Sequence, residues 1–274
     1  MLNPTQPDNG LPAADGAAPL WRFGAIGVAG GFLSGMFGVG GGILMVPLLV
    51  IVGGLDQRKS AATSLLAIIP TAAAGAATYG WRGQLSIPMA AIVAAGSVVG
   101  SWIGATILRR LRLAVLRWAF IALLGAVAVW MAIYVPVRGA EASMTMTVAL
   151  GLVALGLAMG VTSALFGVGG GIVAVPALMA LFGASDLVAR GTSLLIMLPT
   201  ALTGTVANVR AGLADIKRGT VVGLSATAAS LAGSSCAFLL TPRQGNLLFA
   251  ALLLVSAVQL LLKTHRERRT APPM

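Results

Sequence analysis

The sequence predicts an all-α polytopic membrane protein made of two inverted pseudo-repeats. Its 274 residues are 58% apolar and only 9% charged, whereas a typical soluble domain is roughly 25% charged. Apolar runs of about 20 residues, the length that crosses a bilayer as a helix, recur along the whole chain. The glycine-rich stretch Phe37–Ile43 also returns 129 residues later as Phe166–Ile172. We expect about 8 to 10 membrane segments, with a glycine-broken helical hairpin and three long transmembrane helices in each repeat.

Up to ten apolar segments can be placed in order along the chain. Residues 1–19, rich in Pro, Ala, Gly and Asn, precede them and are expected to be disordered. The segments are 20–37, 42–54, 60–80, 85–108, 113–135, 143–166, 171–183, 187–208, 219–240 and 244–262. They group into a first membrane repeat, 20–136, and a second, 143–262. A basic tail, 263–274, follows and is also expected to be disordered.

The repeat extends beyond the glycines. At the same offset of 129, Thr63–Leu66 matches Thr192–Leu195, and Pro70–Ala72 matches Pro199–Ala201. No gap is needed between residues 37 and 104 of the first copy. A match of this length, in this order, predicts an internal duplication.

The charges of the loops favour a turn at each glycine break. Residues 20–54 would reach about 50 Å as one straight helix, against a hydrocarbon core of about 30 Å. If the break is a turn, 14 of the 18 Lys and Arg residues fall on one side of the membrane, whereas a mere kink would leave 10 there. Because cytoplasmic loops collect Lys and Arg, we expect cytoplasmic termini and repeats of opposite orientation. Two short crossings and a re-entrant hairpin both satisfy this pattern.

The two glycine breaks are the strongest candidates for a functional site. Glycine adopts positive φ and lets other backbone approach closely. Non-helical backbone at membrane depth is tolerated only where it is buried in protein or lines a wet cavity. Helix N-termini and successive N–H groups bind anions. The breaks therefore predict an anion site between the repeats, and a tight helix crossing that needs glycine only for packing is the alternative.

A face of hydroxyls follows each break. Ser64 and Thr71 are seven residues apart and share one face of the helix predicted over 60–80. Ser193 and Thr200 are their mates in the second repeat. These hydroxyls could line a substrate path or could bond to backbone across helices, which is common in membranes. The spacing of Gly96, Gly100 and Gly104, by contrast, indicates helix packing.

Charged side chains are missing from the middle of the predicted spans. Arg58, Lys59 and Arg190 lie at segment ends, where we expect solvated loop charges that could attract an anion. Carriers coupled to protons or sodium often place a carboxylate within the membrane, so a cation pathway is not indicated. The sequence has no paired carboxylates, His cluster or Ser/His/Asp set, and we expect no enzyme activity, no metal and no cofactor. The net charge of +11 is clustered between apolar runs, which is typical of membrane loops and not of a nucleic-acid-binding surface.

The doubled pattern Phe-Gly-x-Gly-Gly-Gly-x3-Val-Pro-x-Leu, each copy followed by a Thr-Ser-Leu…Pro-Thr helix, resembles the sulfite exporter TauE/SafE family. The resemblance covers about residues 20–262. It implies a multi-pass permease of the bacterial inner membrane whose substrate is a small sulfur-containing anion such as sulfite, sulfoacetate or another organosulfonate. We expect secondary transport by alternating access. A passive anion channel and a non-transporting membrane scaffold or assembly protein are the alternatives.

The expected substrate-binding residues belong to the breaks and the hydroxyl-bearing helices. They are Gly38, Gly40, Gly41, Gly42, Thr63, Ser64, Thr71, Gly167, Gly169, Gly170, Gly171, Thr192, Ser193 and Thr200. Four prolines in the same motifs are expected to be structural: Pro47, Pro70, Pro176 and Pro199. The expected partners are the anion and the lipid bilayer, and the oligomeric state is left open.

Overall fold

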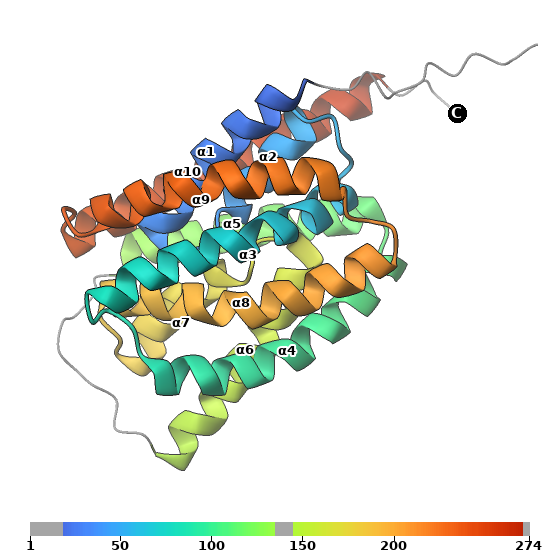
Figure 1. Cartoon of the computed structure of the whole chain (residues 1–274). Coiled ribbons are helices and arrows are strands. Elements are labelled where there is room, and N and C mark those ends of the chain that lie inside the picture. Colours follow the sequence, from blue (N-terminus) through green and yellow to red (C-terminus); the bar gives the residue numbers. More distant parts are fainter. Residues whose placement is uncertain (1–18, 135–144, 271–274) are drawn as a thin grey trace, which may run out of the picture.

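The computed structural model describes residues 19–134 and 145–270, with the side chains from residue 263 onward excepted. These residues form ten α-helices (Figure 1). The helices are α1 (Leu20–Phe37), α2 (Gly42–Ile51), α3 (Gln57–Trp81), α4 (Ile87–Arg110), α5 (Leu113–Ile133), α6 (Met146–Phe166), α7 (Gly171–Phe182), α8 (Asp186–Arg210), α9 (Ile216–Ala237) and α10 (Pro242–Thr270). Eight of them, all except α2 and α7, are long and apolar enough to cross a membrane. The chain is therefore an all-helical polytopic membrane protein, as expected.

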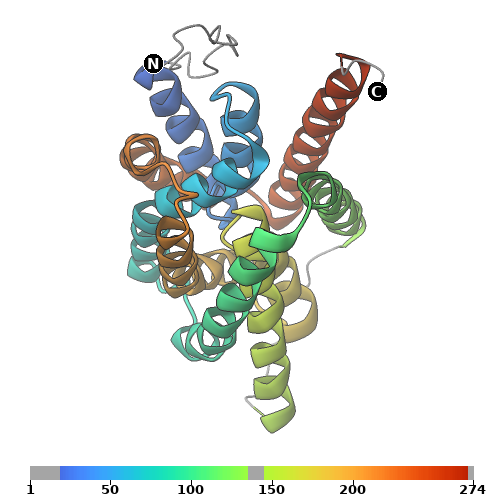
Figure 2. The same ribbon diagram turned by 90° about the vertical axis from the view of Figure 1, so that its right-hand side faces the viewer.

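Each glycine break is the turn of a helical hairpin. Figure 2 shows α2 (light blue) returning beside α1 (dark blue). The end of α2 reaches the start of α1, because Phe23 and Leu49 share one buried cluster. In the second half, Phe182 at the end of α7 lies against Gly151 near the start of α6. The breaks are thus turns and not kinks, which confirms the preference drawn from the loop charges.

Four of the long helices pack side by side in a row, and a further helix packs against each end of the row. Figure 1 shows α9, α3, α8 and α4 side by side in this order, and α1 packs against α9 while α6 packs against α4. Glycines set these contacts: a Cβ on Gly96 or Gly100 would meet carbonyl oxygens of α6, and one on Gly31 would meet the backbone at Ala226 of α9. The prediction that Gly96, Gly100 and Gly104 serve helix packing is confirmed, since all three lie against α6. Small residues let helix backbones approach closely in membranes.

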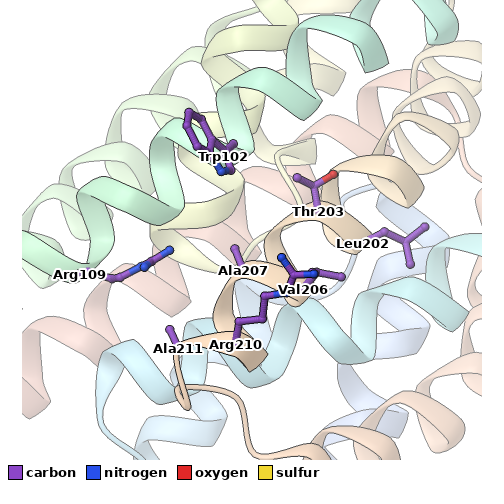
Figure 3. A pocket seen from close by; sticks show the side chains of 8 residues that line it. All are labelled: Trp102, Arg109, Leu202, Thr203, Val206, Ala207, Arg210 and Ala211. Carbon is purple, nitrogen blue, oxygen red and sulfur yellow. The ribbon is translucent and has the colours of Figure 1, made fainter.

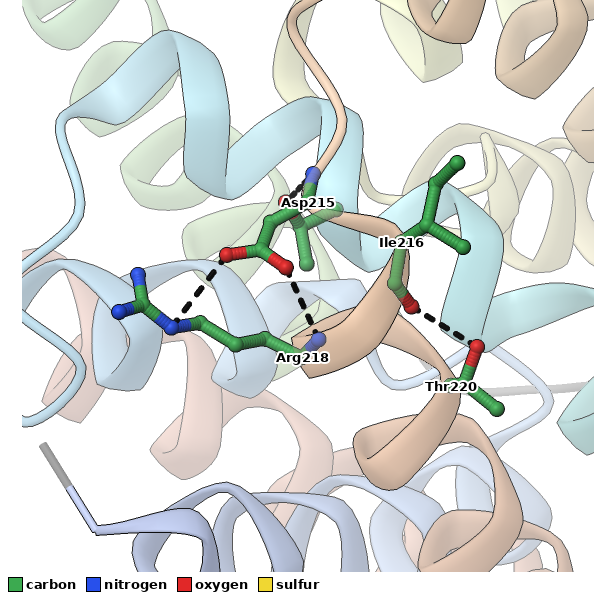
Figure 4. Close-up of polar contacts among 5 residues, drawn as sticks. Asp215, Ile216, Arg218 and Thr220 are labelled. Carbon is green, nitrogen blue, oxygen red and sulfur yellow. Dashed lines mark hydrogen bonds and ion pairs between the residues drawn. The ribbon is translucent and has the colours of Figure 1, made fainter. Parts of the chain in front are cut away.

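Side chains cap several long helices but neither helix that follows a break. Asp56, Thr145, Ser185 and Asp215 each accept hydrogen bonds from first-turn N–H groups. At the start of α9, the Asp215 carboxylate accepts from the Arg218 N–H at 2.9 Å and lies 3.3 Å from its Nε (Figure 4). The N-termini of α2 and α7 have no side-chain cap. The first N–H groups of an uncapped helix have no acceptor within the helix and are free to bind another group.

The C-terminal tail departs from the sequence-based expectation. Helix α10 continues through the basic segment to Thr270, so the prediction of disorder from residue 263 is wrong as far as this residue. Lys and Arg are good helix formers, which allows the helix to extend beyond its apolar part. The predicted N-terminal tail, apart from Pro19, and the boundaries at residues 136 and 143 lie outside the described residues. The four prolines lie inside α2, α3, α7 and α8.

Candidate functional site

The two glycine breaks pack directly against each other. Both have three glycines at positive φ, between 70° and 82°: Gly38, Gly40, Gly41, Gly167, Gly169 and Gly170. A Cβ on Gly42 would meet the backbone of Gly167 and Val168, and one on Gly171 would meet the backbone of Gly38 and Val39. These two contacts are related by the offset of 129. Glycine is therefore required at the breaks for two reasons: the backbone adopts positive φ, and the backbone of the other break lies too close for a side chain.

The paired loops are buried between two layers. On one side, Val39 and Val168 join a cluster with Phe120 of α5 and Phe249 of α10. On the other side, Gly40 and its mate Gly169 face the Met197 sulfur of α8 and Ile68 of α3. The loops are thus enclosed by protein, which is where non-helical backbone is tolerated at membrane depth.

Backbone donors at the breaks have no acceptor among the residues that the structure describes. Within the described part of the chain, the N–H groups of residues 39–41 and 168–170 donate no hydrogen bond. By contrast, Gly38 and Gly167 donate to the carbonyl oxygens of Ser34 and Ser163 at 2.8 Å. Buried N–H groups are nearly always paired, and an unpaired one is costly. Each break therefore offers several open donors beside a helix N-terminus, the arrangement that binds anions.

The predicted hydroxyls surround the breaks and are engaged with protein. Ser64 donates to the Gly167 carbonyl oxygen at 2.6 Å, and Ser193 donates to the carbonyl oxygen of Gly38. The hydroxyls of Thr63 and Thr192 accept from the Asp215 and Ser86 N–H groups at 3.1 and 3.0 Å. Each of these four bonds has its counterpart at the offset of 129. They tie α3 and α8 to the opposite break and to the starts of α9 and α4.

Thr71 and Thr200 form a second pair of links. Both hydroxyls donate to carbonyl oxygens of their own helices, at 2.7 and 2.8 Å. Ser230 donates to the Thr71 carbonyl oxygen and Ser101 to that of Thr200, both at 3.2 Å. The Thr200 hydroxyl also contacts that of Ser97 at 2.6 Å. The structure thus brings Ser64 and Ser193 to the breaks. The four predicted threonines link α3 and α8 to α9 and α4 instead, and substrate binding by any of these residues stays a prediction.

Two serines that sequence reasoning missed lie one turn before the breaks. Ser34 and Ser163 are fully buried, and neither hydroxyl oxygen has a hydrogen-bond partner among the described residues. They occupy equivalent positions at the offset of 129. The signal was present in the sequence, because a serine stands four residues before the first glycine of both breaks. A buried hydroxyl without a partner calls for an explanation such as a ligand or an ordered water.

Arg190 was expected to be a solvated loop charge, and this expectation is wrong. Its side chain is only 3% exposed. Its Nη1 donates to the Met36 carbonyl oxygen at 2.9 Å, and its guanidinium carbon lies 6.0 Å from the Phe37 ring centroid. The start of α8 is therefore buried beside the first break. Arg190 had been expected in a solvated loop because it stands near the end of a predicted segment.

A groove of about 530 Å³ opens between the C-terminal parts of α4 and α8 (Figure 3). Trp102 and Arg109 come from α4, and Leu202 and Arg210 from α8. Trp102 and Leu202 are large exposed apolar side chains, as expected of a surface that faces lipid. No residue of either break lines the groove, so we do not assign it to the substrate.

The eight membrane-length helices and their exposed apolar side chains define a multi-pass α-helical membrane protein. The sequence profile of the sulfite exporter TauE/SafE family matches residues 2–131 and 152–274. The chain belongs to this family, which consists of membrane transporters and not of enzymes.

Several bacterial relatives carry similar descriptions. The "Probable membrane transporter protein YdhB" of Bacillus subtilis (strain 168) is 26% identical over 188 residues, covering 68% of this chain and 77% of the relative. The "Probable membrane transporter protein" of Xylella fastidiosa (strain 9a5c) is 29% identical over 189 residues, covering 68% and 72%. The "Probable membrane transporter protein YunE" of Bacillus subtilis is 28% identical over 211 residues, covering 68% and 77%.

Proposed function

We propose that the protein is a secondary permease for a small sulfur-containing anion such as sulfite, sulfoacetate or another organosulfonate. The observation that carries the proposal is the pair of buried breaks, whose N–H donors have no acceptor in residues 19–134 and 145–270. Donors of this kind complement the oxygen atoms that sulfite and sulfonates share. The family supports transport of such a substrate.

We further propose that the two halves form inverted repeats that alternate around the breaks. The contacts recur in pairs at the offset of 129: Gly42 with Gly167 and Gly171 with Gly38, and likewise α1 with α9 and α6 with α4. Inverted repeats place a substrate site at their interface, and rocking of one against the other exposes it to alternate sides. The family profile also matches the chain in two parts.

We assign different roles to the polar groups of the site. The N–H groups of Gly40, Gly41, Gly169 and Gly170 and the hydroxyls of Ser34 and Ser163 would contact the anion, because they have no partner among the described residues. Ser64, Ser193, Thr63, Thr192, Thr71 and Thr200 would position the breaks through their bonds to protein. The prolines would shape the helices on either side.

The location proposed is the bacterial inner membrane with both termini in the cytoplasm. Figure 2 shows the start of α1 and the end of α10 at the same end of the molecule. The excess of Lys and Arg on that side, 14 of 18 in the hairpin topology, is what cytoplasmic loops carry.

Radiolabelled sulfite and sulfoacetate uptake into proteoliposomes of the purified protein tests the proposal. Saturable uptake of either anion is expected, and its response to an imposed pH gradient would reveal proton coupling. Empty liposomes are the control. Absence of uptake by folded protein would contradict the substrate class and favour a non-transporting scaffold.

A further inference from the structure

One buried cation has no counterpart in the other half of the molecule. Arg190 lies in the first turns of α8, where its Cα and carbonyl oxygen contact Gly38 of the first break. The residue at the equivalent position beside the second break is Ala61, whose backbone contacts Gly167 in the same way. The two breaks therefore have the same backbone contacts, but the residue that packs on the first is charged and the residue that packs on the second is not.

The charge of Arg190 is not balanced by an ion pair. Among the described residues no carboxylate forms an ion pair with its guanidinium. The guanidinium donates to the Met36 carbonyl oxygen and also interacts with the Tyr79 hydroxyl. Asp186 lies one turn earlier on α8 and is 4% exposed. Asp186 and Arg190 are both close enough to Tyr79 to interact with it electrostatically. An unpaired charge inside a membrane protein is expensive and marks substrate or ion pathways.

The start of α10 adds further polar groups. A Cβ on Gly245 would meet the Arg190 guanidinium, so the first turn of α10 lies against it. The next residue, Asn246, is 2% exposed, and neither its Nδ2 nor its Oδ1 has a partner among the described residues. Asn246 shares a helix face with Phe249 one turn later, whose ring lies 5.3 Å from that of Phe37. Arg190 thus borders Phe37, immediately before the first break, and Asn246 stands between Gly245, which lies against Arg190, and Phe249, which lies against Phe37.

A second cation stands nearer the surface on this side. The Arg82 guanidinium carbon lies 4.2 Å from the Phe238 ring centroid, and Phe238 lies 5.3 Å from Tyr79. The Tyr79 hydroxyl donates to the Gly35 carbonyl oxygen at 3.0 Å, one residue before the carbonyl that Arg190 binds. Arg82, Arg190 and the Asp186 carboxylate are thus grouped around Tyr79, on this side of the first break.

The equivalent approach to the second break carries no charge at these positions. Gln57 stands where the second half has Asp186, and Asn208 stands where the first half has Tyr79. Both are 1% exposed. Both amide nitrogens and the Gln57 Oε1 have no partner among the described residues. The residues at these equivalent positions are polar or apolar and uncharged, whereas the charges on this side are those of neighbouring residues such as Arg58.

We propose that Arg190 and Asn246, with the first turn of α10, form an anion-binding subsite of the permease. It receives the sulfonate or sulfite group and passes the anion to the glycine N–H groups. The equivalent positions of the other half, Ala61, Gln57 and Asn208, carry no charge and lack such a subsite. A guanidinium suits this role because its donors match two oxygens of an oxyanion at once. This inference rests on the proposed function.

The test is binding of radiolabelled sulfite and sulfoacetate to the purified full-length protein, combined with flux in proteoliposomes. Arg190→Gln should weaken binding by about 10- to 100-fold, the usual effect of losing a charged hydrogen-bond donor. Arg190→Lys should retain part of the affinity, because it keeps the charge without the fork of donors. Arg210→Gln, on the exposed end of the same helix, is the matched control and should bind as the wild type does.

Asn246→Ala keeps the test decisive if Arg190→Gln does not fold. The Asn246 amide has no partner to lose within the part of the chain that the structure describes, so the variant should keep the thermal stability of the wild type while binding the anion several-fold more weakly. Wild-type affinity in both Arg190→Lys and Asn246→Ala would overturn the subsite, and measurable wild-type flux would leave the proposed function standing. Neither binding nor flux in the wild type would overturn both.

Discussion

The Ser64 hydroxyl on α3 donates a 2.6 Å hydrogen bond to the carbonyl oxygen of Gly167 in the second break. The same bond recurs from Ser193 on α8 to Gly38 in the first break. Each half of the molecule therefore holds the break of the other half. Any movement of one half against the other must carry these bonds along or break them, which links the hydroxyl face to the conformation of the breaks.

Removing one of these hydroxyls should loosen the break it holds. We expect Ser64→Ala to lower the free energy of unfolding by about 0.5–2 kcal/mol, since it leaves a buried carbonyl without its side-chain donor. Ser193→Ala should have the same effect, and thermal unfolding in detergent measures both. The control is Thr220→Ala, which removes an exposed hydroxyl bonded only to its own helix, at Ile216 (Figure 4). Equal stability of all three variants would contradict a holding role.

The contact between the breaks leaves no room for a methyl group. Gly42→Ala and Gly171→Ala should each destabilise the protein by about 1–3 kcal/mol, because the new Cβ would press on the backbone of the other break. The yield of monodisperse protein in size-exclusion chromatography reports the effect. Gly125→Ala, where a Cβ has nothing within 4 Å, should give the wild-type yield. Normal yields for Gly42→Ala would contradict the close packing.

The two unpartnered serines separate binding from folding. Ser34→Ala and Ser163→Ala remove hydroxyls that bond to nothing within the described protein, so thermal stability should stay the same or rise slightly. The KM for anion uptake should increase several-fold, because a contact to the anion is lost. Ser235→Ala, which removes an exposed hydroxyl, serves as the control. An unchanged KM in both serine variants would remove them from the site.

Inverted repeats place equivalent helix ends on opposite sides of the membrane. Trp81 and Arg210 end α3 and α8 at the offset of 129, and both are exposed. In a Cys236→Ser background, a membrane-impermeant maleimide should label Trp81→Cys in intact cells. Arg210→Cys should be labelled only after the membrane is permeabilised. Labelling of both from the same side would show that the two halves have the same orientation.

The sequence predicted the helices well because their signals are local or repeated. Apolar length located the segments, and the positive charges in the loops indicated a turn at Gly38–Gly42. The burial of Arg190 was missed because it depends on α1 and α10, which are distant in sequence. The partners of Ser64 and Ser193 lie more than a hundred residues away for the same reason. The extension of α10 was missed because charge was taken to indicate disorder.

Counterflow tests the central claim, anion transport by alternating access, most directly. Proteoliposomes of the wild type are loaded with unlabelled sulfite or sulfoacetate, and entry of the same labelled anion at trace concentration is followed. A permease that exposes one site to alternate sides should accumulate label transiently above its equilibrium level. Each unlabelled anion that leaves brings the binding site to the outer face, where a labelled anion can bind and be carried in. Label that only equilibrates, at a rate independent of internal anion, would contradict the account and indicate a channel.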